Sequence, residues 1–104
     1  RAQAIGPARP DLIWSPSLAS AAQSWADHLA SIGVLKHSSG SGMGENLFGI
    51  VGKGDSSFAG AAKSWVAEKP LYKGQPIPQG NFESYGHYTQ CVWPSTRQVG
   101  MAAA

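Results

Sequence analysis

Disulfide bonds, strong charge and long apolar runs are all missing from this 104-residue chain. Cys91 is its single cysteine, so no disulfide can form within the chain and a disulfide-stapled scaffold is excluded. Eight Lys and Arg stand against six Asp and Glu, and the basic residues are scattered, so nucleic acid is not expected as a partner. The apolar runs are far shorter than the roughly 18 residues of a membrane-spanning helix, so no such helix is expected.

The composition indicates one globular domain over residues 1–104. Hydrophobic residues make up 42% of the chain and charged residues 13%, which is typical of a protein that buries a core rather than of a disordered chain. At this length one core is enough, without a metal ion or a disulfide to hold it together.

A first helix is predicted from residue 17 to residue 32. Ser15 or Ser17 is suited to cap its N-terminus, Pro16 fits the first turn, and Gly33 ends it. Its apolar side chains recur every three or four residues and are expected to face the core: Leu18, Ala22, Trp25, Leu29 and Ile32.

The rest of the chain predicts one more helix and several strands. The helix runs from residue 56 or 57 to residue 68, and Pro70 ends it. Short strands are predicted at 46–51, 85–93 and 98–104, the last two paired as a hairpin. The segment 70–84 is rich in proline and glycine and is expected to be an irregular loop.

Three features that suggest chemistry are discounted. The glycines at 40–44 lack the spacing and the Lys-Ser or Lys-Thr of a phosphate-binding loop. Cys91 and His87 lie about 13 Å apart if they stand on one strand, so a buried structural thiol is preferred to a nucleophile and base. His28 lies off the apolar stripe of the first helix and is expected on the surface.

Four polar residues stand where regular structure gives way to loops: His37, Glu45, Glu68 and His87. Two imidazoles and two carboxylates in one cleft suit a divalent cation such as zinc. From spacing alone, however, four unrelated polar residues are the preferred interpretation.

Several motifs together resemble one family. The run GHYTQCVW at 86–93, with Thr96, Val99 and Gly100 after it, is similar to the signature strand of the CAP superfamily. That superfamily comprises cysteine-rich secretory proteins, antigen 5 and pathogenesis-related class 1 proteins. Three further motifs precede this run in the same order as in the family: HSS at 37–39, GENL at 44–47 and WVAE at 65–68. The resemblance covers nearly all of the chain.

The resemblance implies an α+β fold, a three-layer α-β-α sandwich with a central antiparallel sheet. It also implies a central cleft into which His37, Glu45, Glu68 and His87 point, with a divalent metal, zinc above all, held by the histidines. The glutamates would contact that ion directly or through water. The alternative is a hydrogen-bonded network that pins the glycine-rich loop without any metal.

The function implied by the resemblance is a secreted binding module of fungal or pathogenesis-related type, for a sterol or another small lipid, in defence or virulence. Apolar side chains on the irregular loop are the expected lipid contacts, with a membrane surface as a further partner: Leu71, Tyr72, Ile77 and Phe82. The same side chains equally suit a lid that packs on the protein without a ligand.

Two alternative functions stay open. The first is a metal-dependent hydrolase or protease in which Glu45 or Glu68 is the general base for a water bound through the histidines. The second is an interaction or signalling domain with a vestigial cleft. Binding is preferred to catalysis, and the oligomeric state is not indicated.

The sequence also departs from the family's pattern. Tyr85 and Met101 stand where many secreted relatives carry disulfide cysteines, so those bridges are absent. The chain begins at Arg1 rather than Met and ends at Ala104, and a strand at 98–104 would have an uncharged edge. We therefore expect the native polypeptide to extend beyond both ends, into at least one more strand.

Overall fold

The structure is a computed structural model that describes residues 1–4, 6–52 and 54–104. The chain divides into two units, each made of two separate stretches. Unit 1 is Arg1–Asp11 with Asp55–Thr96, and unit 2 is Leu12–Gly54 with Arg97–Ala104. No helix among the described residues is both long enough and apolar enough to cross a membrane.

The main element of unit 2 is helix α1, Pro16–Ile32, which confirms the first predicted helix. The Ser15 hydroxyl accepts a hydrogen bond from the Leu18 N–H at 3.2 Å and so caps the first turn. Gly33 has a φ of 68°, the left-handed conformation that glycine adopts without strain, and ends the helix. Leu29 is buried on the predicted core face, whereas Ile32 is 41% exposed.

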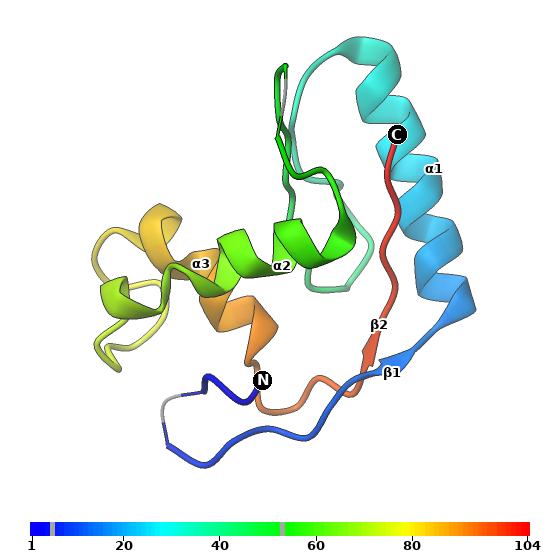
Figure 1. Ribbon diagram of the computed structural model, residues 1–104. Coiled ribbons are helices and arrows are strands. Elements are labelled where there is room, and N and C mark those ends of the chain that lie inside the picture. The colour runs from blue at the N-terminus through cyan, green and yellow to red at the C-terminus, as the bar shows by residue number, and fades with distance from the viewer. Residues whose placement is uncertain (5, 53) are drawn as a thin grey trace. The chain divides into compact units, whose positions relative to one another are not determined.

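Two short parallel strands complete unit 2. Strand β1, Ile13–Trp14, pairs with strand β2, Gln98–Val99, and the Ser15 N–H donates to the Val99 carbonyl at 2.7 Å. Beyond β2 the chain runs beside α1 in the same direction (Figure 1), and Gln23 donates a side-chain hydrogen bond to the Ala103 carbonyl at 3.0 Å. The strand predicted at 98–104 is therefore confirmed only at its start, and 46–51 forms no strand.

The first helix of unit 1 is α2, Phe58–Val66, which confirms the second predicted helix. The Ser57 hydroxyl accepts from the Gly60 N–H at 3.0 Å and caps it. The helix ends two residues before the predicted position, and a single turn of 3₁₀ helix, η1 (Lys69–Leu71), follows with Pro70 inside it.

The segment predicted as the strand 85–93 is instead part of a helix, α3, Phe82–Cys91. The predicted strand, and the hairpin with 98–104, are therefore wrong. The reason lies in the spacing of the buried residues Tyr85, Tyr88, Thr89 and Val92, which are at most 8% exposed. They follow one another at i, i+3, i+4 and i+7, which is one face of a helix and not one face of a strand.

The fold class is confirmed at the level of a mixed α and β protein of mainly helices. The sheet formed by the described residues is the parallel pair β1–β2. The predicted three-layer sandwich with a central antiparallel sheet stays a prediction.

Tyrosine rings form the core of unit 1. Tyr85 and Tyr88 are 1% and 0% exposed, and the Tyr72 ring packs against both, with ring centres 5.2 and 6.2 Å apart. Each buried hydroxyl has a partner: Tyr85 donates to the Gln79 carbonyl and Tyr88 to the Gln3 carbonyl, both at 2.6 Å. Burial of such a ring stabilises a fold by roughly 1.5–3 kcal/mol, provided that its hydroxyl is hydrogen-bonded.

Candidate functional site

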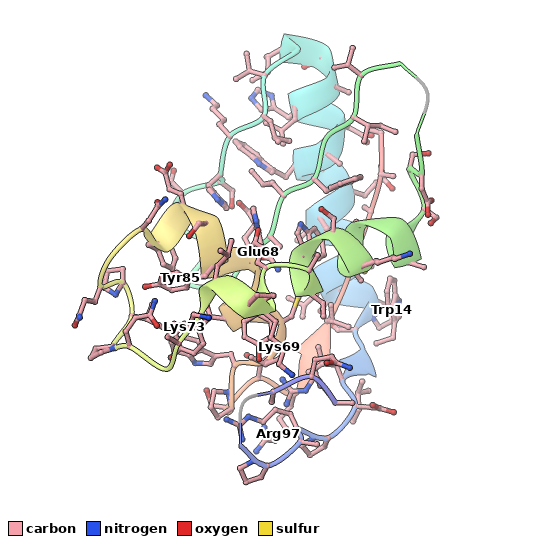
Figure 2. All side chains as sticks on the ribbon, turned by 60° about the vertical axis from the view of Figure 1, so that its left-hand side comes forward. Trp14, Glu68, Lys69, Lys73, Tyr85 and Arg97 are labelled. Atoms are coloured by element: carbon pink, nitrogen blue, oxygen red, sulfur yellow. The ribbon has the colours of Figure 1, made fainter. Side chains whose placement is uncertain are left out.

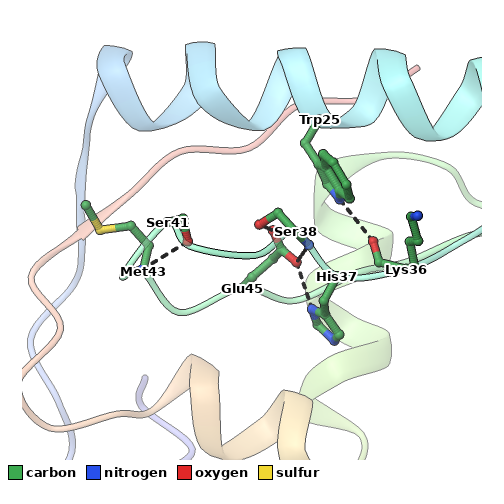
Figure 3. Close-up of polar contacts among 7 residues, drawn as sticks. All are labelled: Trp25, Lys36, His37, Ser38, Ser41, Met43 and Glu45. Carbon is green, nitrogen blue, oxygen red and sulfur yellow. Dashed lines mark hydrogen bonds and ion pairs between the residues drawn. The ribbon is translucent and has the colours of Figure 1, made fainter.

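One of the predicted site pairs lies in the loop that follows α1 in unit 2 (Figure 3). The Nδ1 atom of His37 lies 2.7 Å from Glu45 Oε1. Ser38 donates twice to the same carboxylate, from its backbone N–H to Oε1 at 3.0 Å and from its hydroxyl to Oε2 at 2.7 Å. Glu45 therefore closes the glycine-rich loop on itself through three hydrogen bonds.

Two opposing effects act on the Glu45 carboxyl. Burial raises its pKa, but hydrogen bonds from Ser38 and His37 favour the charged form and outweigh burial. The pKa of Glu45 is consequently lowered from its ordinary value of 4.5. At neutral pH this side chain is a carboxylate that only accepts hydrogen bonds.

The other predicted pair lies in unit 1, where η1 meets α3; Figure 2 labels Glu68 there. Glu68 Oε2 lies 2.8 Å from His87 Nδ1, and Oε1 accepts from the backbone N–H groups of His87 and Tyr88 at 3.0 and 3.2 Å. The imidazole also stacks on Trp65, with ring centres 6.2 Å apart and planes 28° apart. Glu68 lies between α2 and η1 and thus joins that junction to α3.

The two pairs share one geometry. In each, a histidine uses Nδ1 to contact a carboxylate that is bound by further N–H or O–H donors. A carboxylate only accepts, so the neutral imidazole carries its proton on Nδ1 and its lone pair on Nε2. Metal-binding histidines are commonly oriented by a carboxylate in this way.

The structure therefore places the four predicted residues as two pairs, His37 with Glu45 in unit 2 and Glu68 with His87 in unit 1. Within each unit, the described residues form no group of three or more His, Cys, Asp or Glu that would hold a metal ion alone. The shared zinc site of all four residues stays a prediction.

The predicted lipid contacts separate into two sets. Tyr72 is half-buried and Ile77 is 36% exposed, and both line a cavity of about 370 Å³ in unit 1. Leu71 is 54% exposed and does not line it. Phe82 packs edge-on against Tyr85, with ring centres 5.6 Å apart.

The cavity is built from N-terminal residues, from the segment 72–77 and from the segment 88–94. Its lining consists of Ala4, Arg9, Tyr72, Gly74, Ile77, Tyr88, Thr89, Val92, Trp93 and Pro94. Sequence reasoning missed the contributions of Ala4 and Arg9, because nothing near the N-terminus indicates what it packs against. It missed Val92 and Trp93 because that segment was assigned to a strand.

His28 is exposed as expected, whereas Cys91, predicted to be buried, is only partly so. Cys91 is half-buried and packs against the core cluster of Ala4, Tyr88 and Val92. Its separation from His87 was overestimated, since residues four apart on a helix have Cβ atoms about 6 Å apart. His28 is exposed on α1, with its ring beside that of Trp25.

The family model described as the cysteine-rich secretory protein family, CAP, matches residues 8–104. Secreted protein RBT4 of Candida albicans is 39% identical over 89% of this chain and 24% of its own length. Pathogenesis-related protein PR-1 of Medicago truncatula is 39% identical over 88% of this chain and 52% of its own length. Protein PRY2 of Saccharomyces cerevisiae is 41% identical over 86% of this chain and 25% of its own length.

The chain thus spans between about a quarter and about half of the length of these relatives. The relatives include fungal and plant proteins, one of them named for its secretion and others for pathogenesis. No solved structure is significantly similar to the chain.

Proposed function

Because the chain belongs to the cysteine-rich secretory protein (CAP) family, we propose that it is a secreted binding domain that takes up a small lipid, a sterol, in the cavity of unit 1. A role in defence or virulence is proposed with it, supported by relatives named as secreted or pathogenesis-related proteins. The observation that carries the proposal is the cavity itself, because two of the predicted lipid contacts, Tyr72 and Ile77, line it.

The size and lining of the cavity favour one compact apolar ligand. Its volume of about 370 Å³ is near the lower end of the range for small-molecule pockets, roughly 300–1,000 Å³. A single fused-ring lipid suits this space better than a phospholipid with two acyl chains. Tyr72, Ile77 and Val92 offer the ring and aliphatic surface that such a body would bury.

The two predicted lipid contacts that do not line the cavity, Leu71 and Phe82, suit contact with a membrane rather than with the bound lipid. Leu71 is 54% exposed at the end of η1, and Phe82 is 42% exposed at the start of α3. We propose that they contact the membrane surface from which the lipid is taken.

The state of the glutamates favours binding over hydrolysis. A general base needs an available lone pair and a pKa near the working pH. Glu45 and Glu68 each accept three hydrogen bonds, and the pKa of Glu45 is lowered. Both carboxylates are better suited to orient an imidazole than to take a proton from water.

Zinc is the second part of the proposal and rests on the chemistry of the histidines. His37 and His87 are each turned by a carboxylate at Nδ1, and their side chains are 61% and 33% exposed. We propose that these two imidazoles hold one divalent ion through Nε2, with Glu45 and Glu68 as the groups that orient them. Such an ion would supply local positive charge to the site.

A titration with labelled cholesterol tests the lipid proposal. Ile77→Ser removes an apolar side chain from the cavity lining and is expected to weaken binding about tenfold. Leu71→Ser is the matched control, because it removes a similar side chain from the same segment outside the lining. Equal loss in both variants, or no saturable binding by the wild type, would contradict the proposed site.

A further inference from the structure

The cavity of unit 1 contains one charge. Among the described residues that line it, Arg9 alone is ionised at neutral pH. The side chain is half-buried, and two of its nitrogens are fixed by backbone carbonyls: Nε donates to Val92 and Nη1 to Pro7, both at 3.2 Å. These two bonds hold the guanidinium at the end of α3, where the chain leaves the helix.

The charge of Arg9 has no counter-ion in the described part of the chain. Among those residues Arg9 forms no ion pair, and its Nη2 atom makes no hydrogen bond. The C-terminal end of a helix contributes only about half a negative charge, which is spread over its last carbonyls. A net positive charge therefore remains beside an apolar cavity.

Two hydroxyl groups of the lining, those of Tyr88 and Thr89, already donate hydrogen bonds within the protein. The Tyr88 hydroxyl donates to the Gln3 carbonyl at 2.6 Å, and the Thr89 hydroxyl donates to the Gly86 carbonyl at 3.0 Å. Among the described lining residues Arg9 is the charged donor that is left to a ligand, and its planar N–H groups match the oxygens of a carboxylate or a sulfate.

We propose that the cavity selects sterols that carry an anionic group at one end, a sulfate or a carboxylate, over neutral sterols. The ring body would pack against Tyr72, Ile77 and Val92, and the anionic oxygens would accept hydrogen bonds from Nη2 of Arg9. This inference rests on the proposed function, since it names the class of lipid taken by the same site.

The cost of desolvating Arg9 explains why the end group of the sterol determines its affinity for the cavity. A ligand that fills the cavity removes water from the guanidinium, which is costly for a charge without a partner. A neutral sterol hydroxyl replaces the lost water with one hydrogen bond to the guanidinium but carries no charge. A sulfate provides both a hydrogen bond and a negative charge. Hydrogen bonds to charged groups are stronger than those between neutral groups, so a preference of about tenfold is expected.

Competition against labelled cholesterol measures this preference. Unlabelled cholesteryl sulfate and unlabelled cholesterol are compared as displacers with the wild type, Arg9→Lys and Arg9→Gln. The wild type is expected to bind the sulfate about tenfold more tightly than cholesterol, and less so at high salt. Arg9→Lys should keep part of the preference for the sulfate over cholesterol, and Arg9→Gln should abolish that preference.

The outcomes separate this inference from the function on which it rests. If the wild type binds neither compound, the proposed function fails. If it binds both equally, or if it prefers cholesterol, the proposed function stands and the inference about Arg9 is overturned. This comparison needs only the wild type, so it remains decisive even if Arg9→Gln fails to fold. A preference for the sulfate that persists in a folded Arg9→Gln variant also overturns it.

Discussion

Glu68 binds His87 with both of its oxygens, the backbone N–H at Oε1 and the ring Nδ1 at Oε2, at 3.0 and 2.8 Å. The carboxylate therefore fixes the position of the residue and the rotation of its ring at the same time. Since Glu68 follows α2 and His87 lies within α3, the contact is also a link between two helical segments of unit 1. Stability and site geometry depend on the same side chain.

Replacement of Glu68 by Ala is expected to destabilise the protein by about 1–3 kcal/mol, because three N–H groups lose an acceptor. Glu68→Gln keeps one carbonyl oxygen for the backbone donors and should cost less. Urea unfolding of the wild type and both variants measures the free energies. An Ala variant as stable as the wild type would show that the contact contributes nothing.

Glu45 makes stability depend on pH in the acid range. Its pKa is lower in the folded protein than the ordinary 4.5, so its contribution is present above that value and lost as the pH falls through the folded pKa. The stability advantage of the wild type over Glu45→Gln should therefore shrink between about pH 6 and about pH 3. Ser38→Ala removes the hydroxyl donor and should reduce the same advantage at the higher pH. An advantage that grows on acidification would contradict the account.

Gly100 packs directly on the backbone of α1. A Cβ added there would collide with the Ala19 nitrogen and the Leu18 carbonyl carbon, neither of which is able to move aside without distortion of the helix. Gly100→Ala is expected to cost at least about 1–3 kcal/mol. In Gly49→Ala, the control in the same unit, the new Cβ meets only the Leu35 side chain at 3.5 Å, so a change within about 0.5 kcal/mol is expected. Equal stability of the two variants in thermal unfolding would refute the packing of the 98–104 segment on α1.

Zinc uptake is expected at neutral pH and should disappear on acidification, because an imidazole binds a metal ion only in its unprotonated form. Calorimetric titration at about pH 7.5 should show one ion per chain, with binding lost in the His37→Ala, His87→Ala double variant. Glu45→Gln should weaken binding by about 10- to 100-fold through loss of ring orientation. Uptake that is unchanged in the double variant would exclude the proposed ligands.

The first helix was predictable because its limits are set by local chemistry. A serine cap, a proline in the first turn and a glycine with positive φ all act within a few residues of the helix ends. The same holds for α2, which has Ser57 as its cap. By contrast, the pairing of β1 with β2 joins residues far apart in the sequence and leaves no local signal.

The segment of α3 was wrongly predicted as a strand because its composition was given more weight than the spacing of its apolar residues. Aromatic and β-branched residues between 85 and 93 favour a strand. The burial of Tyr85, Tyr88 and Val92 on one face follows the helical spacing, and that spacing was present in the sequence. Tertiary packing of those rings against Tyr72 overrode the intrinsic preference.

The residues of the candidate site were predictable from the sequence, but their contacts with one another were not. The resemblance to the CAP family supplied the four His and Glu positions, and the structure adds that each histidine is held at Nδ1 by one glutamate. The cavity was only half anticipated, through Tyr72 and Ile77. Its remaining walls come from the N-terminal residues and the end of α3, whose approach depends on the tertiary fold.

The most direct test of the central claim is photolabelling with a sterol that carries a photoreactive group on its ring system, followed by mass spectrometry of the labelled peptides. We expect labels on residues that line the cavity, on Tyr72 and Ile77 and on Val92 and Trp93, and we expect excess unlabelled cholesterol to suppress them. Competable labels confined to unit 2, or labels that excess cholesterol does not reduce, would contradict it.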